Sequence, residues 1–145
     1  MRIYLACTVR GDRNAVDGLR ALAAGLESAG HTILTKHLLD PDVDRAESAL
    51  TERAVYERDI EWLESCDLLI AEASGSSFGV GFEVGYVLGR AERTDQRVLL
   101  LYRADRGTAI SRLIAGNAHP RCEVLKYENP EDLALRVSQN LKPTA

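Results

Sequence analysis

Glu83 is a carboxylate in an apolar setting. It falls in the first turn of a helix predicted over residues 79–93, three residues after Val80 and four before Val87, which belong to the apolar stripe of that helix. A charged group at the edge of an apolar face is unusual, because burial penalises the charge. Alternatively, Glu83 points into solvent and interacts only with the helix dipole.

Asp59 is a second carboxylate of this kind. A helix is predicted over residues 51–65, and Asp59 shares its apolar face with Val55 and Leu63, four residues away on either side. Buried carboxylates are rare unless they are paired or functional. Asp59 could instead be structural and cap a neighbouring loop. The other charged residues of this helix are expected on its outer face: Glu57, Arg58, Glu61 and Glu64.

Two carboxylates that face one crevice are the groups that cleave glycosidic bonds. One attacks the anomeric carbon through an oxocarbenium-like transition state, and the other transfers protons or orients the substrate. The same logic holds for an N-glycosidic bond, in which a nucleobase is the leaving group. Glu83 and Asp59 therefore indicate glycosidic-bond chemistry if the fold brings them together.

The segment before Glu83, residues 74–81, is rich in serine and glycine and runs into the predicted helix. Free backbone N–H groups and a helix N-terminus favour an anion there. Ser77 and Gly79 are the best phosphate candidates, and Ser76 is a further possible donor. The segment is neither a Walker A loop nor a Rossmann fingerprint. Glycines that recur every fourth residue are expected to let the helix lie close on a sheet: Gly81, Gly85 and Gly89.

The elements that must position these residues alternate between strand and helix. Strands are predicted at 2–8, 32–35, 67–73, 97–103 and 123–127, with helices at 14–29, 51–65, 79–93, 109–116 and from 129 onward. A polar stretch at 40–44 is expected to be a loop. The alternation predicts one α/β domain over residues 1–145, with a flavodoxin-like, doubly wound, five-stranded parallel sheet in the order 2-1-3-4-5 and helices on both faces.

This strand order also predicts where a ligand binds. The chain reverses between the first and third strands, so the loops that follow them face each other across a crevice. Arg10 and Arg13 of the first loop could contact a sugar phosphate as charge-assisted donors, or could be ordinary surface charges.

Composition narrows the class of protein. Hydrophobic residues make up 46% and charged residues 28%, as in a folded soluble protein. A net charge of −4 argues against a surface that binds nucleic acid. No apolar run is long enough to cross a membrane, and we expect a cytoplasmic protein without a membrane partner. The three cysteines are expected to be buried free thiols, and no Cys/His spacing suits a metal, so no metal or cofactor is expected.

Three motifs in order resemble the 2′-deoxynucleoside 5′-phosphate N-hydrolases of the nucleoside 2-deoxyribosyltransferase superfamily. They cover residues 4–11, 57–63 and 77–85, and the similarity runs over nearly the whole chain. The resemblance implies hydrolysis of the N-glycosidic bond of a (2′-deoxy)nucleoside 5′-monophosphate through a covalent sugar intermediate on Glu83. Asp59 would support the nucleophile and the departing base, and Tyr4 would lie near Glu83 and the sugar.

The resemblance also implies a nucleotide pocket and a homodimer. The first loop would line the pocket with Thr8, Val9, Arg10, Gly11 and Arg13. Ser77 and Gly79 would hold the phosphate, joined by Ser111 of the partner subunit, and His37 would lie near the base. This chain has Cys7-Thr8 where the family has Gly-Ser, which narrows the sugar end of the pocket.

Two other functions stay open. A nucleoside 2-deoxyribosyltransferase would exchange bases and should lack a phosphate site, so the phosphate candidates favour the hydrolase. A non-catalytic nucleotide sensor would not need to keep Tyr4, Asp59 and Glu83 together. Relatives that cleave ribonucleotides have Phe in place of Tyr4, which favours deoxyribose as the sugar.

Overall fold

The structure is a computed structural model that describes residues 1–75 and 77–141. Ser76, one of the serines expected to donate to a phosphate, lies outside the described residues. No helix in the described part of the chain has both the length and the apolar character needed to span a membrane.

Five parallel strands form one sheet in the order β2-β1-β3-β4-β5. These are β1 (Arg2–Ala6), β2 (Thr32–Ile33), β3 (Leu68–Glu72), β4 (Arg97–Arg103) and β5 (Cys122–Tyr127). The predicted fold class and strand order are therefore confirmed. Ala6 of β1 lies opposite Ala71 of β3, so the loops after these two strands begin side by side at the carboxyl edge of the sheet.

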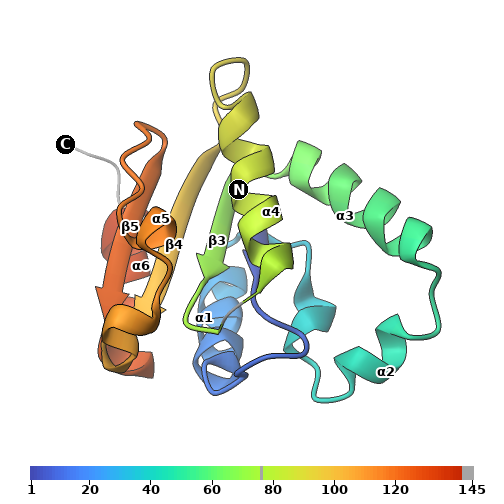
Figure 1. Ribbon diagram of the computed structural model, residues 1–145, viewed down its shortest axis with the longest axis horizontal. Helices are drawn as coiled ribbons and strands as arrows, with labels where there is room; N and C mark the ends of the chain where they lie inside the picture. The colour runs from blue at the N-terminus through green and yellow to red at the C-terminus, as the bar shows by residue number, and fades with distance from the viewer. Residues whose placement is uncertain (76, 142–145) are drawn as a thin grey trace.

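Helices cover both faces of the sheet (Figure 1). The long helices are α1 (Val16–Ser28) and α6 (Pro130–Asn140) on one face, and α3 (Glu52–Ser65) and α4 (Phe78–Arg90) on the other. Shorter helical turns lie between them: η1 (Lys36–Leu39), α2 (Val43–Glu47), η2 (Ala104–Ala109) and α5 (Arg112–Ala115).

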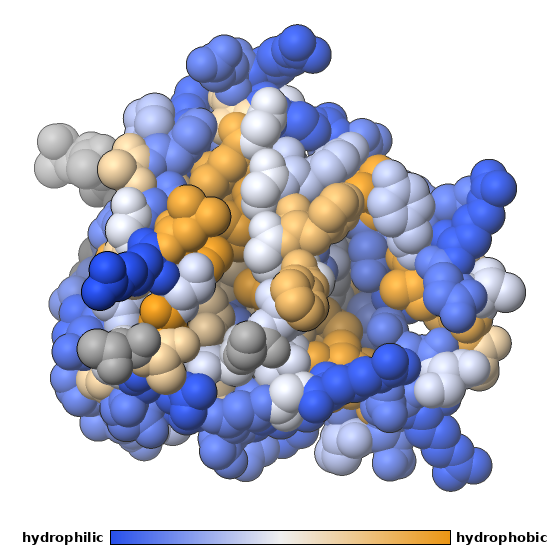
Figure 2. Space-filling model, in the orientation of Figure 1, coloured by the Kyte–Doolittle hydropathy of each residue, from blue (hydrophilic) through white to orange (hydrophobic). Residues whose placement is uncertain are grey.

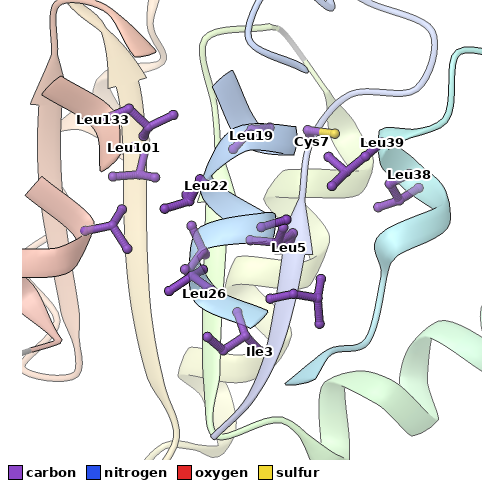
Figure 3. Packing of buried hydrophobic residues seen from close by; sticks show 14 of the residues in the cluster. Ile3, Leu5, Cys7, Leu19, Leu22, Leu26, Leu38, Leu39, Leu101 and Leu133 are labelled. Atoms are coloured by element: carbon purple, nitrogen blue, oxygen red, sulfur yellow. The ribbon is translucent and has the colours of Figure 1, made fainter. Parts of the chain in front are cut away.

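Alternation along β1 divides the core into two clusters. Ile3 and Leu5 point toward α1, where Leu19 and Leu22 pack against them (Figure 3). Tyr4 points to the opposite face, toward α3 and α4. All five residues of β3 are buried, as expected for a central parallel strand with both faces covered. A site residue on β1 or β3 is therefore rigidly held.

Two predicted elements differ in the structure. The stretch 40–44 was expected to be a loop, but α2 begins at Val43, whose buried side chain joins the core cluster around α1. Helix α4 begins at Phe78, because the Ser77 hydroxyl accepts a hydrogen bond from Val80 N at 3.3 Å and caps the helix. Glu83 therefore lies in the second turn, and its predicted place in the first turn was wrong.

The predicted role of the α4 glycines was also wrong. The residues that pack on the sheet are the three valines Val80, Val84 and Val87. The three glycines Gly81, Gly85 and Gly89 are exposed, and a Cβ atom added to any of them would meet nothing within 4 Å. They form a strip without side chains on the outer face of α4.

Candidate active site

A cavity of about 550 Å³ opens at the carboxyl ends of β1 and β3, where the strand order reverses. Its volume is in the range of sites that hold small ligands. The lining residues come from five segments: Cys7, Thr8, Val9, Arg10 and Gly11; Leu38; Glu47; Asp59; and Ser77, Phe78, Gly79, Val80 and Glu83. The fold thus brings Asp59 and Glu83 to one cavity.

A short hydrogen bond joins Glu83, which lines the cavity, to Tyr4 in the core behind it. Tyr4 is completely buried on β1, and its hydroxyl donates to Glu83 Oε1 at 2.6 Å. The pKa of Glu83 is raised to about 7, chiefly by burial and further by the nearby carboxylates of Asp59 and Glu47, whereas the Tyr4 hydrogen bond opposes the shift. Burial and the Glu83 charge raise the pKa of Tyr4 strongly, so its hydroxyl stays protonated and acts as a donor.

Arg58 lies beside the cavity, where it binds two of the lining carboxylates, so its predicted place on the outer face of α3 was wrong. Its Nε donates to Asp59 Oδ1 at 2.8 Å and its Nη2 to Glu47 Oε1 at 2.6 Å. The guanidinium also lies 5.0 Å from the centroid of the Trp62 ring. Periodicity within α3 could not reveal this, because the second acceptor belongs to α2.

His37 belongs to the same cluster without lining the cavity. Its ring packs against Trp62 with 5.4 Å between centroids. Its Nε2 is buried 3.4 Å from Glu47 Oε1 and forms no hydrogen bond with the described residues. Burial, and then the Arg58 charge, lower the pKa of His37, which favours the neutral imidazole.

Glu72 anchors the start of the loop that leads to Ser77 and Gly79. This residue was not identified from the sequence. Glu72 is buried at the end of β3, and its Oε1 accepts hydrogen bonds from the Ser74 hydroxyl, from Ser74 N at 3.2 Å and from the Tyr127 hydroxyl at 3.0 Å. Burial raises the pKa of Glu72, and these hydrogen bonds oppose the shift. A lone glutamate in an otherwise apolar strand was the available signal.

Gly75 brings this loop against the loop after β1. A Cβ atom at position 75 would lie 2.7 Å from Thr8 Cγ2 and 2.9 Å from Asp12 O, so only glycine fits without displacement. Thr8 in turn accepts a hydrogen bond from Gly11 N at 2.9 Å, which shapes its own loop. The two loops therefore form one packed unit at the cavity.

The two arginines of the first loop have different places. Arg10 lines the cavity and is exposed, with its Nε 2.9 Å from Asp44 Oδ1. Arg13 does not line the cavity, because its guanidinium donates to the carbonyl oxygens of Thr8 and Leu38, each at 2.9 Å. Arg13 thus ties the first loop to η1.

Ser111 does not line this cavity either. It precedes α5 and is exposed on a neighbouring cavity of about 520 Å³, which Ser77 and Phe78 also line. The three cysteines are free thiols, as expected, but only Cys7 and Cys66 are buried, whereas Cys122 is half-buried. Removal from water raises the pKa of each to about 11. Over residues 1–75 and 77–141, no group of three or more His, Cys, Asp or Glu side chains is arranged to hold a metal ion.

Fold and site together define a class: a doubly wound α/β protein with a buried tyrosine–glutamate pair in a cavity at the switch point. The family model of nucleoside 2-deoxyribosyltransferase matches residues 3–133. The chain belongs to this family, as its motifs predicted.

Two curated relatives are similar over most of the chain. A Thermofilum pendens protein, provisionally named 2′-deoxynucleoside 5′-phosphate N-hydrolase 1, is 39% identical over 132 residues, covering 91% of this chain and 89% of its own. The 5-hydroxymethyl-dUMP N-hydrolase of Danio rerio is 34% identical, covering 90% of each chain. Among solved structures, Clostridium botulinum CMP N-glycosidase shares the fold, with a TM-score of 0.72 at 17% identity over 97% of this chain and 100% of its own.

Proposed function

We propose that this protein is an N-glycosidase that hydrolyses 2′-deoxynucleoside 5′-monophosphates to free base and 2-deoxyribose 5-phosphate. Family membership and the names of its relatives support the reaction class. The observation that carries the proposal is the hydrogen bond from Tyr4 to Glu83, a carboxylate that lines a cavity of nucleotide size.

In the proposed reaction Glu83 is the nucleophile. Tyr4 holds Oε1, which leaves Oε2 to attack C1′ of the sugar. The bond from C1′ to the base nitrogen breaks, and its electron pair leaves with the base, which takes up a proton. Asp59, in the same cavity, orients the base and assists this proton transfer. Water then attacks C1′ of the glycosyl ester, releasing the sugar phosphate and the Glu83 carboxylate.

The phosphate would lie at the start of α4. The exposed backbone around Gly79, the helix N-terminus and the Ser77 hydroxyl offer donors to an anion there. From the facing loop, residues 8–11 line the same cavity, and Arg10 adds a positive charge. Arg13 would act indirectly, by holding that loop in place.

A second copy of the chain is the partner proposed for the outer face of α4 and α5. Phe78 is 101% exposed, Phe82 52% and Leu113 84%, and Figure 2 shows hydrophobic residues gathered on this face. The glycine strip of α4 lets another backbone approach closely. In such a dimer Ser111 of one subunit would reach the phosphate held by the other.

The proposed location is the cytoplasm, where thiols stay reduced, and the free thiols of the three cysteines agree with it.

Base release tests the function directly. The protein is incubated with a panel of deoxynucleoside and ribonucleoside 5′-monophosphates and the matching nucleosides, and free base is followed by chromatography. Base released from deoxynucleoside monophosphates alone supports the proposal. Exchange that requires an added second base identifies a transferase. Nucleotides that raise the melting temperature without being cleaved identify a sensor.

The dimer has its own test. Sedimentation equilibrium at micromolar concentration is expected to give twice the mass of the chain. Leu113→Asp places a charge on the exposed apolar face and is expected to give a monomer with weaker phosphate binding. A wild-type protein that sediments as a monomer contradicts the proposal.

A further inference from the structure

Glu47 brings a third carboxylate to the nucleotide cavity, beside those of Asp59 and Glu83. It lies at the end of α2, and its side chain is only 17% exposed. The proposed reaction uses the other two carboxylates and leaves Glu47 without a role. Arg58 already pairs with this carboxylate, but the side chain also lines the cavity, where a ligand can reach it.

The position of Glu47 places it toward the base. Phosphate and base are attached to opposite ends of the sugar, and the proposed phosphate site lies at the start of α4, a few residues before Glu83. A nucleotide with its C1′ at Glu83 then extends its base toward the rest of the lining, which includes Leu38, Glu47 and Asp59.

The orientation of Glu47 is set by Arg58. Glu47 Oε1 accepts from Arg58 Nη2 at 2.6 Å, and Arg58 is itself held by Asp59 and by the Trp62 ring. Among the described residues the hydrogen bond to Glu47 is made to Oε1, and none is made to Oε2. One oxygen is thus fixed by the protein, and the other remains available as an acceptor in the cavity.

A carboxylate oxygen accepts hydrogen bonds and cannot donate them. Cytosine and adenine present an exocyclic amino group, which is a donor, whereas uracil and hypoxanthine present a carbonyl oxygen at the same position. A carbonyl facing Glu47 would place two acceptors against each other in a partly buried site.

We propose that Glu47 is a specificity-determining residue that accepts a hydrogen bond from the exocyclic amino group of the base. The protein then prefers nucleotides with an amino-bearing base over their oxo counterparts. This inference rests on the proposed function, since it assigns the substrate class of the same site.

Two matched pairs of substrates test it: dCMP against dUMP, and dAMP against dIMP. The members of each pair differ in the exocyclic group, amino or oxo, and in the hydrogen that the oxo member carries on the adjacent ring nitrogen. The wild-type protein is expected to favour the amino member roughly tenfold or more in kcat/KM. Glu47→Gln keeps an oxygen for Arg58 and turns an amide N–H₂ toward the base, so the preference should fall at least about tenfold, toward the oxo member.

Glu57→Gln is the matched control, because Glu57 is an exposed carboxylate on α3 that pairs with Arg53 away from the cavity. The Glu57→Gln protein should favour the amino-bearing nucleotides over the oxo nucleotides by the same kcat/KM ratio as the wild type. Wild-type ratios near one, or a Glu47→Gln preference equal to that of the wild type, would overturn the inference while leaving the hydrolase intact.

A binding measurement distinguishes a failure of the Glu47 inference from a failure of the proposed hydrolase function. Thermal stabilisation by the same four nucleotides is measured in a Glu83→Gln background, with and without Glu47→Gln. If no base is released by any protein but dCMP and dAMP still stabilise more strongly through Glu47, the inference holds and the hydrolase fails. Equal stabilisation by all four nucleotides in both backgrounds rejects the inference.

Discussion

The Tyr4 hydroxyl donates a hydrogen bond to Glu83 Oε1 at 2.6 Å, joining the buried strand β1 to the second turn of α4 across 79 positions of sequence. Because Tyr4 is completely buried, the donor cannot move away from the carboxylate without disturbing the sheet. The contact orients Glu83 and favours its charged form.

Activity is expected to depend on pH through this pair. Glu83 must be ionised to attack, and its pKa is raised to about 7, so kcat should fall as pH decreases below about 7. Tyr4→Phe removes the hydrogen bond that opposes this shift, so the acidic limb should move to higher pH. Profiles of kcat against pH for both proteins measure the effect. An acidic limb at the same pH in both would refute this role of Tyr4.

Glu83→Gln should reduce base release by about 10³-fold or more, because the amide cannot act as the nucleophile. The Glu83→Gln protein should nevertheless be more stable than the wild type at neutral pH. The folded-state pKa of Glu83 lies above its ordinary value of 4.5, so the wild type loses stability as pH rises from about 4.5 through about 7. Glu83→Gln removes this loss, and its advantage in urea unfolding should grow over that interval. A rate near wild type would rule out Glu83 as the nucleophile.

Asp59→Asn should lower kcat by about 10²-fold or more, with the fold retained, because the charge that assists departure of the base is lost. The same change weakens the contact with Arg58 Nε. Arg53→Gln, which breaks an exposed ion pair on the same helix, is the control and should have little effect. Steady-state rates at saturating nucleotide compare the Asp59→Asn and Arg53→Gln variants. A rate near that of the wild type for Asp59→Asn would show that Asp59 has only a structural role.

Gly75→Ala should destabilise the protein by about 1–3 kcal/mol, because its Cβ meets Thr8 Cγ2 and Asp12 O at less than 3 Å. KM should rise as well, since the displaced loops line the cavity. Thr8→Ser removes the methyl group and should recover part of the loss in a double variant. Urea unfolding of the two single variants and the double variant measures the coupling; strict additivity would show that the two side chains do not meet.

Much of this molecule could be predicted from its sequence. The alternation of apolar strands and amphipathic helices predicts a doubly wound parallel sheet, and the flavodoxin-like strand order expected for it brings the loops after β1 and β3 together. Periodicity also identified Asp59 and Glu83 as carboxylates turned toward apolar faces. In both cases the information is local, or follows from the connection rules of parallel sheets.

What could not be predicted depends on contacts between distant segments. Arg58 looks like a surface residue within α3, and only the presence of α2 provides Glu47 as its second partner. In the sequence Arg13 resembles a phosphate ligand, but in the structure its guanidinium donates to the carbonyl oxygen of Leu38 in η1. A four-residue spacing places the α4 glycines on one face of the helix but does not say which face. In the structure the three valines Val80, Val84 and Val87 occupy the face toward the sheet.

Helix α2 is only five residues long, and Val43 is its one buried side chain. The Tyr4–Glu83 pair, to which we assign the attack on the sugar, stands elsewhere, on β1 and α4. In our proposals, attack on the sugar and choice of base are therefore assigned to different elements of the fold. A substitution at Glu47 can then change the choice of base while Val43 keeps α2 packed on the core and the Tyr4–Glu83 pair is retained.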